Sequence, residues 1–178
     1  MVFPGWLQVC FSTTSIFLIY DQFIFDGLMS QHNRYIHLDV SSNSTVFEFT
    51  STGPKGDILK IIQFSQTEIN NVYNLGFGNI RNDGSIDDTT TNDNKDRDKI
   101  LATVASAVNE FTDRFPHRQV FFTGSTMERT RLYRMAITIN YEVLSTDYEI
   151  WGLKDEGLFE PFVKRRQYAG FLIKRKKS

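Results

Sequence analysis

The sequence contains few of the residues that stabilise small proteins through covalent or metal bonds. Cys10 is the single cysteine among 178 residues, so no disulfide can form within the chain. The three histidines are scattered, at His32, His37 and His117, and one cysteine cannot complete a zinc site with them. We therefore predict no metal. The sixteen phenylalanines and seven tyrosines instead provide large apolar side chains for a core.

Signals for a cofactor and for long-range electrostatic attraction are also absent. Gly76-Phe77-Gly78 lacks the third glycine and the following helix of a dinucleotide-binding fingerprint, and no cofactor is predicted. The formal net charge of −1 gives no overall field that would attract nucleic acid or an anionic membrane. The charge is nevertheless uneven. Residues 81–98 are rich in aspartate, whereas residues 164–177 form a basic C-terminal tail that either contacts phosphate or keeps the chain soluble.

The first twenty residues carry no charge and end in an apolar run at 16–20. A signal peptide has a basic region before such a run, and this chain has none. A membrane helix needs about twenty mostly apolar residues, and this segment is interrupted by Pro4, Gln8 and the hydroxyl residues at 12–15. No membrane anchor is therefore predicted. Two alternatives stay open for residues 1–28: a peripheral extension, or upstream sequence that is not translated because translation begins at Met29. Residues 29–178 are predicted to form a single α+β domain with the basic tail at its end.

Alternating apolar residues predict strands near both ends of this domain. Phe47 and Phe49 lie on one face of the first strand, and Gly53-Pro54-Lys55-Gly56 is typical of the turn in a hairpin. The strands are predicted at 45–50, 58–64, 72–78, 85–90, 119–123, 148–153, 158–163 and 168–173.

Helical spacing of apolar residues predicts two principal helices, at about 97–115 and 126–144. Asp96 or Asp98 is expected to cap the first helix, and Pro116 to end it. The order of strands and helices predicts an α+β fold, with a mainly antiparallel sheet of about six to seven strands packed against the two helices.

A strand, a glycine and an arginine-rich helix start follow one another at residues 122–134. The first backbone amides of a helix lack partners within it, and the helix dipole favours negative charge there. Hydroxyl groups add donors, and the planar guanidinium of arginine binds phosphate through two hydrogen bonds. We therefore identify a candidate anion-binding site formed by Gly124, Ser125, Thr126, Arg129, Arg131 and Arg134.

The same segment also has a purely structural interpretation. Ser125 and Glu128 have the spacing of a capping box, in which the two side chains satisfy the helix start internally. Arg131 and Arg134 lie opposite the apolar stripe of the helix, so the three arginines do not converge by helix geometry alone. They are equally explained as exposed helix residues. The stripe runs through Leu132, Met135, Ala136, Ile139 and Val143.

Between residues 46 and 176 the chain contains, in this order, Phe47-Glu48-Phe49, Gly53-Pro54-Lys55-Gly56, Tyr73-Asn74-Leu75-Gly76-Phe77-Gly78, Leu101-Ala102-Thr103-Val104, Thr123-Gly124-Ser125-Thr126, Arg129-Thr130-Arg131-Leu132-Tyr133-Arg134 and Glu160-Pro161-Phe162. Together these motifs resemble a bacterial family of small proteins known only as a domain of unknown function. The resemblance implies a cytoplasmic bacterial α+β protein that starts shortly before the first strand, in agreement with Met29. It supplies no catalytic residues.

Three functions fit the candidate site. The first is a protein that binds a phosphate-bearing ligand or RNA through residues 124–134. The second is a small enzyme acting on nucleotides or nucleic acid, or a toxin component neutralised by a partner protein. In that enzyme the arginines stabilise charge on phosphate, and Asp87 or Tyr133 transfers protons. The third is an interaction domain whose arginines form salt bridges with a partner protein.

Overall fold

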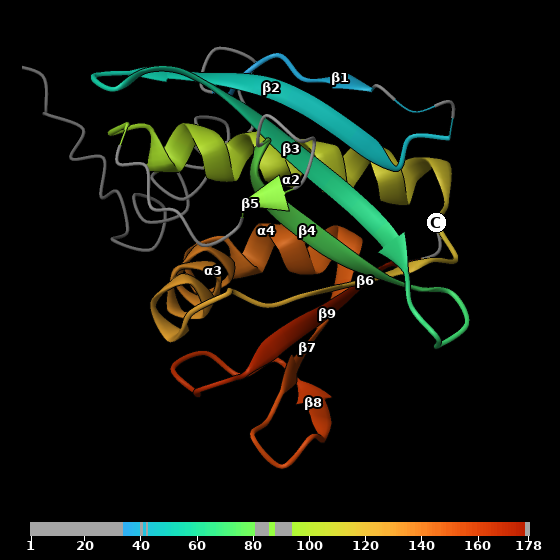
Figure 1. Cartoon of the computed structure of the whole chain (residues 1–178). Coiled ribbons are helices and arrows are strands. Elements are labelled where there is room, and N and C mark those ends of the chain that lie inside the picture. The colour runs from blue at the N-terminus through green and yellow to red at the C-terminus, as the bar shows by residue number, and fades with distance from the viewer. Residues whose placement is uncertain (1–33, 40, 42, 81–85, 88–93, 177–178) are drawn as a thin grey trace, which may run out of the picture.

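The computed structural model describes residues 34–39, 41, 43–80, 86–87 and 94–176, which form one mostly antiparallel sheet with helices packed on it (Figure 1). The described strands follow the spatial order β1-β2-β3-β4-β6-β9-β7-β8, and β5 pairs with β4. Strand β4 is parallel to β6, and the other pairs are antiparallel. The predicted α+β class and mainly antiparallel sheet are therefore confirmed. The strands are Leu38–Asp39 (β1), Val46–Gly53 (β2), Gly56–Gln66 (β3), Val72–Ile80 (β4), Ile86–Asp87 (β5), Gln119–Phe122 (β6), Tyr148–Leu153 (β7), Phe159–Pro161 (β8) and Gly170–Arg175 (β9).

Strands β2 and β3 form the hairpin that the turn motif predicted. Gly53 pairs with Gly56, whose φ of 85° lies in the left-handed region that favours glycine. Phe47 on β2 pairs with Ile62 on β3, and both side chains are fully buried. The apolar face of the hairpin is thereby turned toward the core.

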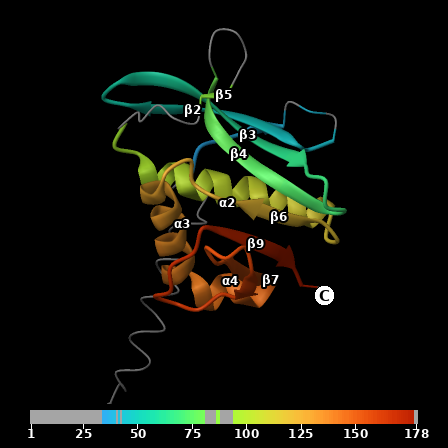
Figure 2. The ribbon, with the colours of Figure 1, turned by 60° about the horizontal axis from the view of Figure 1, so that its bottom comes forward.

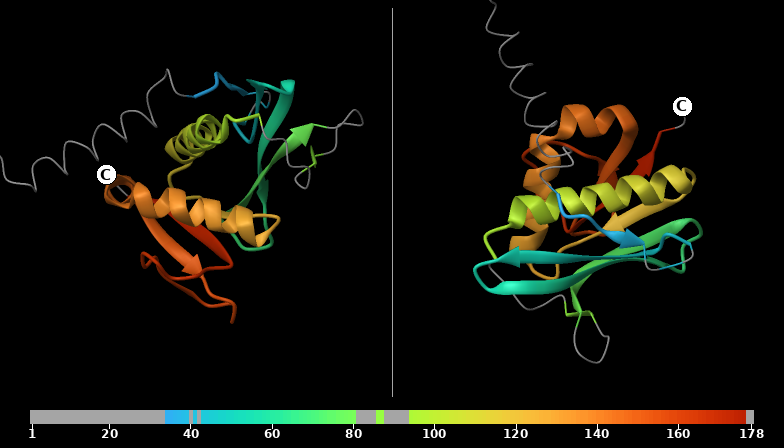
Figure 3. Two further views of the ribbon diagram at one scale, coloured as in Figure 1. Left: turned by 90° about the vertical axis from the view of Figure 1, so that its left-hand side faces the viewer. Right: turned by 90° about the horizontal axis from the view of Figure 1, so that it is seen from above.

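Helix α2, at Arg97–Arg114, agrees with the first predicted helix to within one residue. Figures 2 and 3 show that it lies between strands β2–β4 on one side and the third and fourth helices on the other. Phe111 is fully buried, and its ring stacks on Phe64 of β3 with 4.1 Å between the centroids. Aromatic packing of this kind fixes the helix on the sheet.

The predicted capping of α2 by an aspartate side chain is wrong. Asp96 occupies the cap position but makes no side-chain cap hydrogen bond. Its Oδ2 atom instead accepts hydrogen bonds from the hydroxyl groups of Tyr35, at 2.8 Å, and Ser51, at 2.6 Å. The carboxylate therefore bonds to tertiary donors and not to the amides of the first helical turn.

The second predicted helix is interrupted at Asn140. Helix α3 spans Met127–Ile139 and helix α4 spans Tyr141–Asp147, and Figure 1 shows the two at an angle to each other. Asn140 is buried, and its side-chain amide donates to the carbonyl of Ala136 at 2.8 Å. The side chain therefore uses an acceptor of the last turn of α3, which accompanies the change of direction.

The buried face of α3 differs from the predicted apolar stripe. Met135 and Ile139 are 45% and 63% exposed, whereas Thr130 and Ile137 are buried. The Thr130 hydroxyl accepts a hydrogen bond from the backbone amide of Gly124 at 3.1 Å. This contact turns the Thr130 side of the helix inward, and Ile137, two turns further along the same face, follows it into the core.

The predicted extension at 1–28 and the predicted start at Met29 lie outside the described residues, and that division of the chain stays a prediction. In the part that the structure describes, none of the helices combines the length and apolar character needed to cross a membrane.

Candidate functional site

The turn before α3 requires glycine at position 124. A Cβ atom placed there would lie 2.6 Å from the Cβ of Arg129 and 2.7 Å from its carbonyl carbon, and closer still to the backbone nitrogen of Thr130. These are far below normal contact distances. Gly124 therefore brings the end of β6 directly against the first turn of α3. Its backbone amide donates a hydrogen bond to the Thr130 hydroxyl.

The helix start is capped one residue later than a Ser125–Glu128 capping box would require. Thr126 is the cap, and its Oγ1 accepts a hydrogen bond from the backbone amide of Arg129 at 3.3 Å. Ser125 instead accepts a hydrogen bond from the Arg129 guanidinium at 2.8 Å. Hydrogen bonds from its own backbone amide and from Thr126 lower the pKa of Glu128. The carboxylate consequently stays ionised beside the helix start.

The three arginines of α3 point to different surroundings, as helix geometry predicted. Arg129 is half-buried and lines a pocket beside the sheet. Arg131 is exposed. Arg134 reaches the segment after β8, where it donates hydrogen bonds to the side chain of Gln167 and, at 3.4 Å, to the carbonyl of Arg166. Of the six candidate residues, Arg129 lines this concave pocket, and Ser125 is hydrogen-bonded to it.

That concave site is a polar pocket of about 410 Å³, bounded by β3–β5, the start of α2 and the start of α3. Its volume lies within the range of about 300–1,000 Å³ that is typical of small-molecule sites. We call it the polar pocket. The side chains and backbone that line it belong to Lys60, Phe77, Gly78, Asn79, Asp87, Asn94, Lys95, Asp96, Arg97, Ile100, Leu101, Arg129, Leu132 and Tyr133.

Lys60 is the most unusual group in the polar pocket, because a lysine is rarely covered by protein. The residue is 5% exposed, and its Nζ donates to Oδ1 of Asn79 at 2.5 Å and lies 5.9 Å from the ring centre of Phe77. Burial lowers the pKa of Lys60; the charge of Asp96 opposes this shift and the charge of Arg129 adds to it. Lys60 and Arg129 thus repel each other across the pocket.

Cationic side chains outnumber carboxylates among the residues that line the pocket. Four of its residues are cationic, and two, Asp87 and Asp96, are carboxylates. Asp96 already accepts two hydroxyl hydrogen bonds, and Arg97 contacts Asp98 at 3.3 Å. Side-chain neighbours therefore balance part of the charge, and Asp96 lies near enough to Lys60 for its charge to raise the pKa of that lysine.

Lys60 and the start of α2 were not among the predicted site residues. The sequence does contain a signal for Lys60. Strand side chains alternate between faces, so Lys60 shares a face with Ile62 and Phe64, both of which are buried. A lysine on the apolar face of a strand indicates either a paired charge or a ligand.

No metal centre is indicated by the residues that the structure describes. Among them, no group of three or more His, Cys, Asp or Glu side chains is arranged to hold a metal ion.

The fold and the pocket define an α+β protein with a ligand-sized polar site beside its sheet. The chain belongs to the Family of unknown function DUF6934, whose family model matches residues 31–176. This match confirms the predicted relationship to a domain of unknown function. A comparison with curated proteins and a comparison with solved structures each gave no match.

Proposed function

We propose that this protein binds a small phosphate-bearing ligand in the polar pocket. The observation that carries the proposal is the convergence of the buried Lys60 and the half-buried Arg129 on one recess. Two cations that repel each other in a partly desolvated site are stabilised when an anion lies between them. The guanidinium of Arg129 suits phosphate geometry, and Lys60 supplies a point charge.

The remaining walls favour a ligand that also carries an apolar or aromatic part. Phe77, Leu101, Leu132 and Tyr133 line the same pocket as the cations. Aromatic side chains provide flat surfaces on which a nucleobase stacks. A nucleotide combines the two chemistries, with its phosphates at Lys60 and Arg129 and its ring on the apolar wall.

A small ligand fits better than RNA, the other ligand considered from the sequence. The cations are recessed in a pocket, whereas RNA and DNA are bound along extended basic surfaces. The exposed Arg131 and the Arg134 contact to Gln167 do not extend the positive wall of the pocket. The chain as a whole is slightly acidic.

A nucleotide-directed enzyme is the second candidate function. It is favoured by one specific observation: Asp87 and Tyr133, which were considered as proton-transfer groups, line the same pocket as Lys60 and Arg129. Release of inorganic phosphate from a nucleotide, lost in Asp87→Asn, would distinguish this enzyme from a binding protein. Four expectations from the sequence stay predictions. They are a toxin component neutralised by a partner protein, a partner protein bound through salt bridges, a bacterial origin and a cytoplasmic location.

The proposal is tested by calorimetric titration of the full chain with inorganic pyrophosphate and with ADP. We expect both to bind, ADP more tightly because of its ring, and both more weakly at high salt. Arg129→Ala removes a charge-assisted hydrogen bond worth about 1.5–3 kcal/mol, which corresponds to a loss of about 10- to 150-fold in affinity.

Arg131→Ala is the matched control, because it removes the same side chain from the exposed side of the same helix. Its affinity should stay within about twofold of the wild type, since exposed charges contribute little. Absence of binding by the wild type, or equal losses in the two variants, would exclude the proposed site.

A further inference from the structure

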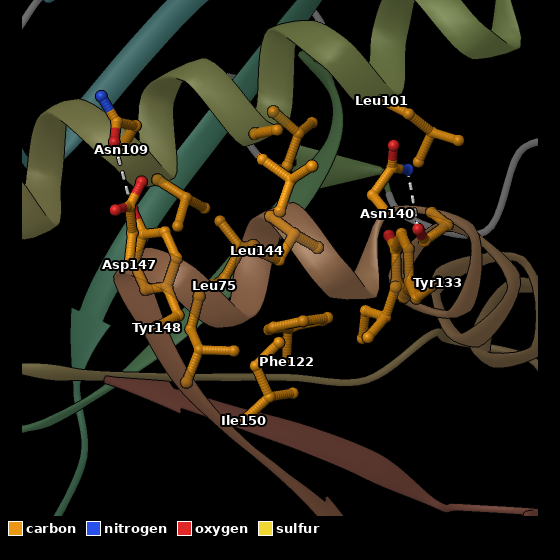
Figure 4. A pocket seen from close by; sticks show the side chains of 17 residues that line it. Leu75, Leu101, Asn109, Phe122, Tyr133, Asn140, Leu144, Asp147, Tyr148 and Ile150 are labelled. Carbon is orange, nitrogen blue, oxygen red and sulfur yellow. Dashed lines mark hydrogen bonds between the residues drawn. The ribbon is translucent and has the colours of Figure 1, made fainter. Parts of the chain in front are cut away.

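A second recess, different in chemistry from the polar pocket, lies between the helices and the sheet. It has a volume of about 150 Å³, is partly open to solvent, and is bordered by α2, the α3–α4 pair and strands of the sheet (Figure 4). We call it the apolar cavity. Figure 4 shows Asn109 and Tyr148 at one end and Tyr133 and Asn140 at the other. Leu101 and Tyr133 belong to the walls of both recesses.

The walls of the apolar cavity are hydrocarbon over most of their surface. Helix α2 contributes Val104 and Val108, helix α4 contributes Leu144, and the sheet contributes Phe122 and Ile150. An ordered water needs two to four polar partners, and such walls do not provide them. The space is therefore unsuited to water and suited to an apolar guest.

The polar groups at the ends of the cavity are already engaged. The Tyr148 hydroxyl donates to Oδ1 of Asn109 at 3.2 Å and shares a hydrogen bond with the Thr112 hydroxyl at 2.9 Å. Burial raises the pKa of Tyr148, so its hydroxyl stays neutral. The Asn140 amide donates to Ala136. The charged residue of the lining, Asp147, is exposed.

The break between α3 and α4 lies at the wall of the cavity. The two helices meet at Asn140, which lines the cavity. Ala105 on α2 and Ala136 on α3 are short side chains on the two walls. These short side chains leave space for a small guest between the two walls.

We infer that the apolar cavity binds a small uncharged apolar molecule, of about the size of one aromatic ring. The size follows from the volume, since a dry cavity of about 150 Å³ lined by Leu, Ile and Phe accommodates benzene in another protein. The uncharged character follows from the walls, because a charged group would lose its hydration without gaining a partner there. This site does not depend on the phosphate site.

The first test is thermal unfolding of the full chain with toluene as the probe and benzoate as its charged counterpart. A ligand that binds the folded state raises the Tm as its concentration increases. We expect toluene to raise the Tm and benzoate not to. Ala136→Leu and Ala105→Leu each fill the space from one wall and should abolish the toluene shift.

Two control variants locate the effect. Ile139→Leu alters an exposed residue of the same helix and should keep the toluene shift. Arg129→Ala should keep it as well, even where it abolishes phosphate binding, so that failure of one site is distinguished from failure of the other. Crystals pressurised with xenon should show a xenon atom among Val104, Leu144 and Ile150. The inference would be overturned if toluene left the Tm of the wild type unchanged and no xenon atom appeared at this site. It would also be overturned if the toluene shift persisted in both Ala136→Leu and Ala105→Leu.

Discussion

Replacing Gly124 with alanine tests whether β6 and α3 are held together as described. The added Cβ would meet backbone atoms of Arg129 and Thr130, which cannot rotate away as a side chain would. Overpacking of this kind costs about 1–3 kcal/mol. Moving the helix away also loses the hydrogen bond from the Gly124 amide to Thr130, worth about 1 kcal/mol. The free energy of unfolding should therefore fall by about 2–4 kcal/mol.

This loss corresponds to a decrease in Tm of about 4–16 °C for a chain of this length, measured by circular dichroism during heating. Gly76→Ala is the control, because its new Cβ would lie at an ordinary 3.8 Å from the carbonyl oxygen of Gln63. Its stability should change by less than about 1 kcal/mol. A Gly124→Ala variant as stable as the wild type would refute the close approach of β6 and α3.

Three further predictions concern the core and the titrating groups. Phe111→Ala should lower the free energy of unfolding in urea by about 3–5 kcal/mol, whereas Phe159→Ala, at a residue 46% exposed, should lower it by less than about 1.5 kcal/mol; similar losses would contradict the core assignment. The pKa of Lys60 is lowered in the folded state, so the unfolded chain binds more protons up to the ordinary pKa of 10.5. Between the lowered pKa and 10.5, the Tm of the ligand-free wild type should consequently rise with pH relative to the Tm of Lys60→Met. If the two Tm values changed in parallel with pH, Lys60 would not be desolvated. Hydrogen bonds from Tyr168 and Arg166 lower the pKa of Glu160, so its contribution is present above the ordinary value of 4.5 and lost as the pH falls through the lowered pKa. The difference in Tm between the wild type and Glu160→Gln should disappear over that acidic range, and a constant difference would contradict this role.

Local sequence signals were sufficient to predict the β2–β3 hairpin and helix α2. The Gly53–Gly56 turn fixes the register of β2 and β3 because the glycine at its end adopts a positive φ. Helical spacing of apolar residues places α2 because that face packs on the sheet. The parallel pairing of β4 with β6 joins segments separated by a whole helix, and no local signal in the sequence predicts it.

The helix at 126–144 shows where local signals fail. No proline or glycine marks the break at Asn140, and the structure shows there a buried asparagine whose side chain donates to the carbonyl of Ala136. The face of α3 was also assigned wrongly, because hydrophobicity favoured Met135 and Ile139. The contact of Thr130 with Gly124 decided the orientation instead.

For the candidate site, sequence reasoning selected Arg129 and the glycine turn and did not select Lys60 on the opposite wall of the pocket. Lys60 lies 69 positions before Arg129 in the chain, and no spacing rule connects them. They meet because β3 and the start of α3 border the same recess. The sequence pattern at the start of α3 contains no information about Lys60, so it could not predict this second cation.

The presence of an anion between Lys60 and Arg129 is tested most directly by the ionisation of Lys60 itself. The Cε resonance of this lysine, followed by NMR through an alkaline titration, reports its pKa with and without inorganic pyrophosphate. We expect the pKa to rise when pyrophosphate binds, because the anion compensates both the burial of Lys60 and the nearby charge of Arg129. An identical pKa in the presence of saturating pyrophosphate would contradict binding in the polar pocket.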